Sequence, residues 1–198
     1  MSKRVEFFFD VGSPTSYLAW TQLPALCEQA GAELVYRPTL LGGVFQATGN
    51  VSPVSVAAKG RYMHDDMARF ARRYGVPFVM NPHFPINTLM LMRGAAGAQL
   101  RAPARLPAYL RAVFEAMWVV PQNLNDPALA AQALASAGFD AAEMMGWVND
   151  ADVKAALRAS TEEAVARGVF GAPTMFVGSQ MFFGQDRLDF VRDALAQR

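Results

Sequence analysis

The chain has 198 residues, of which 53% are hydrophobic and 18% are charged. This composition suits one folded domain, or one domain with a sizeable insertion, and excludes a disordered chain. The 18 basic and 17 acidic residues leave a net charge of +1, which provides no global field for nucleic acid. Polar residues interrupt every apolar stretch before about 18 residues, so we expect a cytoplasmic protein with no membrane span or signal peptide.

The first 40 residues are predicted to form a βαβ unit. Residues 5–11 are β-rich and mostly apolar, which is typical of a buried central strand. Ser13 and Pro14 favour a helix start, because serine accepts hydrogen bonds from free N–H groups and proline suits the first turn. A helix over residues 17–30 and a strand over residues 33–40 follow. The two strands should be parallel.

The middle of the chain is predicted to be helical, because apolar residues recur at helical spacing. Several segments begin with Asn or Asp residues that can cap a helix. The predicted helices cover residues 61–74, 87–100, 107–118, 128–138, 141–148 and 150–168. A hairpin over residues 174–177 and 181–183 and a last helix over residues 187–196 complete the chain.

This order of elements predicts an α/β fold with an all-helical insertion. The insertion separates an N-terminal βαβ half from a C-terminal ββα half. Residues 1–56 and 167–198 would form the α/β domain, and residues 57–166 the helical insertion.

Cysteine, histidine and arginine residues give few functional signals. Cys27 is the single cysteine, so the chain has no internal disulfide, C-x-x-C pair or thiolate cage. Its neighbours are apolar, which favours a buried position. The two histidines, His64 and His83, do not indicate a metal site. A basic cluster has the spacing of a solvated helix face rather than a phosphate site, and consists of Arg69, Arg72 and Arg73.

The segment from Ser13 to Ser16 lies between the first strand and its helix. Open α/β sheets bind ligands at this end, and a helix N-terminus favours an anion. Thioredoxin-like proteins carry C-x-x-C here, whereas this chain has S-x-x-S, which excludes disulfide exchange. A serine hydroxyl is a poor nucleophile without a base, but it can donate a hydrogen bond to a thiolate from another molecule. The alternative is that Ser13 is an ordinary N-cap.

Two further motifs flank the predicted hairpin. Pro173 follows Ala172 directly before a strand, which favours a tight and cis peptide bond. Such a bond would leave the N–H and C=O groups of Ala172 free to pair with an extended peptide. An ordinary strand-entry proline is the alternative. Asp186 either caps the last helix or, with Gln185, holds the α-amino group of a γ-glutamyl peptide.

Together, these motifs resemble the 2-hydroxychromene-2-carboxylate isomerases and the kappa-class glutathione transferases. The similar segments are residues 8–19, 49–50, 59–63, 170–176 and 182–188, so the resemblance covers nearly the whole chain. It implies a thioredoxin-like fold related to the Dsb oxidoreductases, with a helical insertion. It also implies glutathione as the cofactor and a homodimer as the assembly.

The resemblance implies a role for each matching residue. Ser13 would lie beside the glutathione sulfur, and Asn50 and Lys59 would reach the thiol region and the glycyl end. The remaining glutathione contacts would come from Ala172, Pro173, Gln185 and Asp186. The substrate pocket would include Tyr17, Phe84 and Asn87, with Trp20 as a weaker candidate.

We therefore expect a glutathione-dependent isomerase. It would interconvert 2-hydroxychromene-2-carboxylate and trans-o-hydroxybenzylidenepyruvate, or a close aromatic relative, by reversible addition of a thiolate. A glutathione transferase or peroxidase is an alternative that uses the same glutathione site. A non-catalytic peptide binder with this fold is a second alternative. No metal, nucleic-acid or membrane partner is expected.

Overall fold

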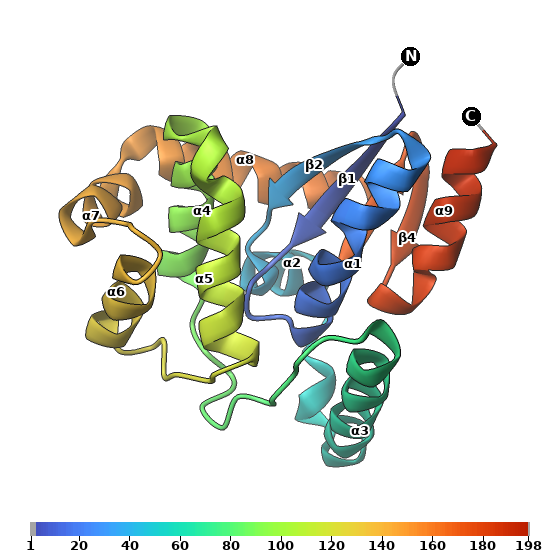
Figure 1. The fold of residues 1–198 in the computed structure, drawn as a ribbon, viewed down its shortest axis with the longest axis horizontal. Helices are drawn as coiled ribbons and strands as arrows, with labels where there is room; N and C mark the ends of the chain where they lie inside the picture. The colour runs from blue at the N-terminus through green and yellow to red at the C-terminus, as the bar shows by residue number, and fades with distance from the viewer. Residues whose placement is uncertain (1–2, 198) are drawn as a thin grey trace.

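A four-stranded sheet lies at the centre of the computed structural model, which describes residues 3–197 (Figure 1). The strands are β1 (Arg4–Phe9), β2 (Glu33–Pro38), β3 (Thr174–Val177) and β4 (Gln180–Phe183), and their spatial order is β2-β1-β3-β4. Strand β1 is parallel to β2, with Phe7 opposite Tyr36, and antiparallel to β3. Strands β3 and β4 form the predicted hairpin. The thioredoxin-like α/β fold is thus confirmed.

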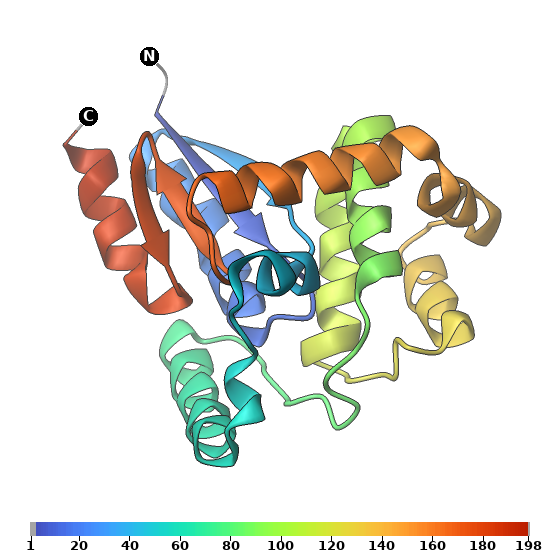
Figure 2. The same ribbon diagram turned by 180° about the vertical axis from the view of Figure 1, so that it is seen from behind.

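Helices cover both faces of the sheet, which explains why β1 is almost continuously apolar. Helices α1 (Pro14–Ala30) and α9 (Leu188–Ala196) cover the face shown in Figure 1. Helices α2 (Leu41–Thr48) and α8 (Ala151–Ala166) cover the opposite face, which is turned to the viewer in Figure 2. Side chains alternate between the two faces of a strand. Phe7 and Phe9 therefore belong to the large hydrophobic cluster that includes α1, whereas Phe8 belongs to a smaller cluster with residues of α2 and α8.

The remaining helices form the helical part between β2 and β3. Helix α3 (Ala57–Tyr74) lies below the carboxyl end of β1 in Figure 1, whereas α4 (Leu89–Arg101), α5 (Leu106–Trp118), α6 (Pro127–Ala135) and α7 (Ala141–Asn149) form a lobe beside the sheet. Short 3-10 turns occur at Pro53–Ser55, Pro103–Arg105 and Gln185–Arg187. None of the helices in residues 3–197 has both the length and the apolar character needed to cross a bilayer.

Helix α2 was not predicted from the sequence. Its first turn contains Gly42 and Gly43, which lower helix propensity. The helix packs on α8, and a Cβ at Gly43 would lie 3.2 Å from a methyl group of Thr161. Tertiary packing therefore stabilises a helix that its local sequence does not favour, and a side chain at Gly43 would make this contact tighter than usual.

Several predictions about single residues are confirmed. The side chain of Ser13 caps α1, and Asp126 and Asp150 cap α6 and α8. Cys27 is buried, and this burial raises the pKa of its thiol to about 11. Helix α3 begins four residues earlier than predicted, at Ala57 rather than 61, and α4 begins two residues later, at Leu89 rather than 87.

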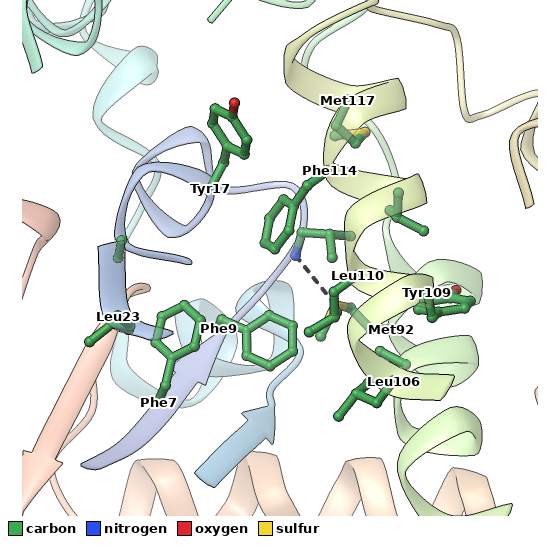
Figure 3. Packing of buried hydrophobic residues seen from close by; sticks show 14 of the residues in the cluster. Phe7, Phe9, Tyr17, Leu23, Met92, Leu106, Tyr109, Leu110, Phe114 and Met117 are labelled. Atoms are coloured by element: carbon green, nitrogen blue, oxygen red, sulfur yellow. Dashed lines mark hydrogen bonds between the residues drawn. The ribbon is translucent and has the colours of Figure 1, made fainter. Parts of the chain in front are cut away.

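One apolar core joins the sheet to the helical lobe (Figure 3). The ring of Phe9 lies 6.4 Å from that of Phe114 on α5. Two hydrogen bonds hold the segment after β1 against the lobe. Trp118 donates from Nε1 to the carbonyl of Val11 at 2.9 Å, and the Val11 N–H donates to Sδ of Met92 at 3.4 Å. The segment that carries Ser13 therefore rests on helices far away in the sequence.

Asp10 is a buried acceptor for three donors. Oδ1 accepts from the Gly12 N–H at 2.9 Å, while Oδ2 accepts from the Leu41 N–H at 2.8 Å and from the Thr88 hydroxyl at 3.0 Å. Burial raises the pKa of this carboxyl, and the three hydrogen bonds oppose that rise. Asp10 thus ties together the loop before α1, the start of α2 and the residue before α4.

The substitution Asp10→Asn should destabilise the protein, because the amide NH₂ replaces one acceptor and faces a donor. We expect a loss of about 1–3 kcal/mol in the free energy of unfolding, measured by urea denaturation. The matched control is Asp140→Asn at the exposed N-cap of α7, where asparagine caps as well as aspartate and stability should not change. Equal effects of the two substitutions would contradict this role of Asp10.

Candidate active site

Ser13 lies at the start of α1, held by a tight turn after β1. The Ser13 N–H donates to the carbonyl of Asp10 at 3.0 Å, and its Oγ accepts from the Ser16 N–H at 3.1 Å. The same Oγ donates to the carbonyl of Ala172 at 2.9 Å and lies 2.9 Å from Oγ1 of Thr15. Ser13 is therefore an N-cap whose single hydroxyl hydrogen is donated to the Ala172 carbonyl in this structure.

The two serines of S-x-x-S have different environments. Ser13 lines a cavity, whereas Ser16 is fully buried and, among the described residues, its Oγ has no hydrogen-bond partner. A buried hydroxyl without a partner is unfavourable for stability. Only the first serine is therefore placed to meet a ligand.

The Ala172–Pro173 peptide bond is cis, as the sequence pattern favoured. The expectation that both backbone groups of Ala172 are free is wrong for the carbonyl, which accepts hydrogen bonds from Ser13 and Thr15. The Ala172 N–H makes no hydrogen bond within residues 3–197. A Cβ at Gly171 would lie 2.7 Å from the ring of Phe183, so a larger residue there would require this partly exposed ring to move.

These groups meet in a cavity of about 330 Å³ at the carboxyl end of β1. Six of the residues named from the sequence line it: Ser13, Asn50, Phe84, Ala172, Gln185 and Asp186. The other walls are mainly apolar and include Phe45, Met63, Met67, Met80 and Phe183. Among the described residues that line it, none is Lys, Arg or His. The N-terminus of α1, which carries Ser13, is therefore a source of positive potential there.

The two polar ends of the cavity come from segments far apart in the sequence. Asn50 follows α2 and donates from Nδ2 to the carbonyl of Phe170 at 2.8 Å. Gln185 is buried, and its carbonyl accepts from the Tyr74 hydroxyl at 2.8 Å. Asp186 is partly exposed and forms an ion pair with Arg187. Burial, followed by the charge of Asp186, raises the pKa of Tyr74 to about 12.

Four other predicted site residues are not among those that line this cavity, and one of them, Pro173, directly follows the lining residue Ala172. Tyr17 is buried among aromatic rings and donates to the carbonyl of Pro77 at 2.6 Å. Asn87 is exposed, and its Oδ1 accepts from the Leu89 N–H at the start of α4. Lys59 is exposed in the first turn of α3. In the structure, Tyr17 and Asn87 have packing and capping roles that a sequence pattern does not separate from ligand contact.

The structure adds polar residues that the sequence analysis did not assign to the site. Thr15, Ser52 and Asp66 line the cavity. Thr15 was visible inside the S-x-x-S motif, whereas the other two carry no motif of their own. Asp66 accepts a hydrogen bond from Arg69 on the same helix at 3.4 Å, so its charge is partly balanced.

Replacing each of the two serines by alanine should have a different effect on stability. Ser13→Ala removes the cap of α1 and should cost about 1 kcal/mol of the free energy of unfolding. Ser16→Ala removes a buried hydroxyl without a partner and should leave the stability unchanged or higher. Urea denaturation of both variants checks this contrast, and a larger loss for Ser16→Ala would contradict it.

Comparison with known proteins agrees with this geometry. Residues 4–196 match the family model of the DSBA-like thioredoxin domain. A 2-hydroxychromene-2-carboxylate isomerase from Sphingobium xenophagum is 33% identical over 98% of this chain and 99% of its own. Glutathione S-transferase kappa 1 from Homo sapiens is 28% identical over 100% of this chain and 93% of its own.

A solved structure of a 2-hydroxychromene-2-carboxylate isomerase superimposes with a TM-score of 0.82 at 31% identity, covering 98% of this chain and 95% of its own. The similarity therefore extends through the helical part and is not confined to the sheet. The chain belongs to the DSBA-like thioredoxin family, within the group that contains the 2-hydroxychromene-2-carboxylate isomerases and the kappa-class glutathione transferases.

Proposed function

We propose that this protein is a glutathione-dependent isomerase. Its substrate pair would be 2-hydroxychromene-2-carboxylate and trans-o-hydroxybenzylidenepyruvate, or a close aromatic relative. Full-length relatives that carry the isomerase name support the reaction class. The observation that carries the proposal is the buried Ser13 hydroxyl, which lies at a helix N-terminus in a cavity with mainly apolar walls.

Several groups of the chain fit glutathione. The Ala172 N–H has no partner within the described residues and would pair with the cysteinyl backbone. Gln185 and Asp186 line the same cavity and would hold the γ-glutamyl end, where Asp186 offers a carboxylate to an ammonium group. The names of the kappa-class relatives support the same cofactor. We propose Asn50 and Lys59 for the thiol region and the glycyl end, and Pro173 as the residue that shapes the Ala172 turn.

When bound, glutathione supplies a thiolate that adds reversibly to a double bond conjugated with a ketone, so that the bond can rotate. The chain must keep the thiol ionised. The N-terminus of α1 favours negative charge, and the Ser13 hydroxyl can donate a hydrogen bond to it. Developing negative charge on the substrate requires donors nearby. No Lys, Arg or His side chain lines the cavity within residues 3–197, and the Ser16 N–H is already bonded to Ser13. The donor that we assign to this charge is therefore the Thr15 N–H, which makes no hydrogen bond within the described residues.

The apolar walls fit an aromatic substrate. Phe84 lies between α3 and α4 in the sequence, and its ring is 6.0 Å from that of Trp118. Met63, Met67 and Met80 surround the same space with flexible side chains. We propose Phe84 as a substrate contact. Tyr17 and Asn87, which lie outside the lining, remain predictions with only indirect roles in the pocket.

Binding of glutathione is the first test, measured by isothermal titration calorimetry. Asp186→Asn should weaken the affinity by about ten- to hundredfold, because it removes a charged partner of the ammonium group. Asp193→Asn is the matched control: it removes the same charge from an exposed position on α9 and should bind as the wild type does. Absence of wild-type binding at millimolar glutathione would contradict the proposal and favour a peptide-binding function.

A further inference from the structure

Three oxygens at the cavity form a closed triangle of hydrogen-bond distances. Ser13 Oγ lies 2.9 Å from Thr15 Oγ1 and 2.9 Å from the Ala172 carbonyl oxygen, and Thr15 Oγ1 lies 3.3 Å from the same carbonyl. The triangle contains two hydroxyl hydrogens and one group that can only accept. Either hydroxyl can therefore serve as the donor to the Ala172 carbonyl.

The hydrogens have alternative arrangements that satisfy the carbonyl. In one arrangement Ser13 donates to Ala172, and Thr15 donates to the Ser13 oxygen. In another arrangement Thr15 donates to Ala172, which leaves the Ser13 hydrogen free to point into the cavity. In both arrangements Ser13 Oγ still accepts from the Ser16 N–H, so the cap of α1 is unchanged.

We propose that Thr15 is a positioning residue that takes over the Ala172 carbonyl and thereby releases the Ser13 hydroxyl to donate to a thiolate. Without the Thr15 hydroxyl, the same rotation of Ser13 would leave a partly buried carbonyl without this partner, which is unfavourable. Ser13 would then remain bonded to Ala172 and would stabilise the thiolate less. This inference rests on the proposed glutathione function.

The variant Thr15→Val tests the proposal because valine has nearly the shape of threonine and lacks the hydroxyl. The readout is the pKa of bound glutathione, measured from thiolate absorbance in the ultraviolet as the pH is raised. We expect a rise of about one pKa unit, which lowers the thiolate fraction about tenfold at pH values below the pKa. Thr15→Ser keeps a hydroxyl and should restore the wild-type pKa.

Affinity for S-methylglutathione separates this effect from structural damage. This ligand has no thiol to ionise, so Thr15→Val and wild type should bind it equally in calorimetry. Thr15→Ala is a second variant in case valine perturbs the first turn of α1, and it should raise the thiol pKa in the same way.

Ser13→Ala, measured in parallel, distinguishes failure of the proposed role of Thr15 from failure of the proposed glutathione function. A wild-type thiol pKa in both Thr15→Val and Thr15→Ala, with a raised pKa in Ser13→Ala, would overturn the role of Thr15 alone. Absence of glutathione binding by the wild type, or an unchanged pKa in Ser13→Ala, would overturn the proposed function and the role of Thr15 together.

Discussion

The carboxylate of Asp10 is the constraint on which the cavity depends. It is fully enclosed, and its two oxygens accept hydrogen bonds from three segments that are separate in the sequence. Two of the donors belong to Gly12 and Leu41, which line the cavity, and the third belongs to Thr88 before α4. These hydrogen bonds therefore hold the sheet, α2 and the helical lobe together directly before Ser13.

The same arrangement defines the electrostatics of the candidate active site. Ser13 lies between the end of β1 and the N-terminus of α1. The loop with the cis Ala172–Pro173 bond places the Ala172 carbonyl oxygen 2.9 Å from the Ser13 hydroxyl. The lining of the cavity includes two acidic side chains, Asp66 and Asp186. Within the described part of the chain, no basic side chain lines it. Stabilisation of an anion must then come from hydroxyl and N–H groups at the helix start. This is the physical reason for assigning the thiol to Ser13.

The sequence was sufficient to predict most of the fold. Alternation and continuity of apolar residues located the four strands, and capping residues located α1, α6 and α8. Helix α2 was missed because its two glycines oppose a helix locally, whereas its packing on α8 stabilises it. Contacts between distant segments of this kind are not visible in a local pattern.

The candidate site was predictable where a motif fixes the backbone. Four predicted residues lie in short segments next to the end of a strand or the start of a helix, and all four line the cavity: Ser13, Ala172, Gln185 and Asp186. Tyr17 and Asn87 lie in the expected segments but point elsewhere, because their side chains satisfy the carbonyl of Pro77 and the N–H of Leu89. That Ser13 and Thr15 can each donate to the same carbonyl follows from distances, which only the structure provides.

Conversion of 2-hydroxychromene-2-carboxylate with glutathione far below the substrate concentration shows whether the thiol at Ser13 is recycled or consumed. We expect complete equilibration with the free thiol conserved. Ser13→Ala should lower the rate at neutral pH and move the rise of the rate to higher pH, while Ser16→Ala should behave as the wild type. Consumption of glutathione in proportion to product, or a wild-type pH profile in Ser13→Ala, would contradict this mechanism.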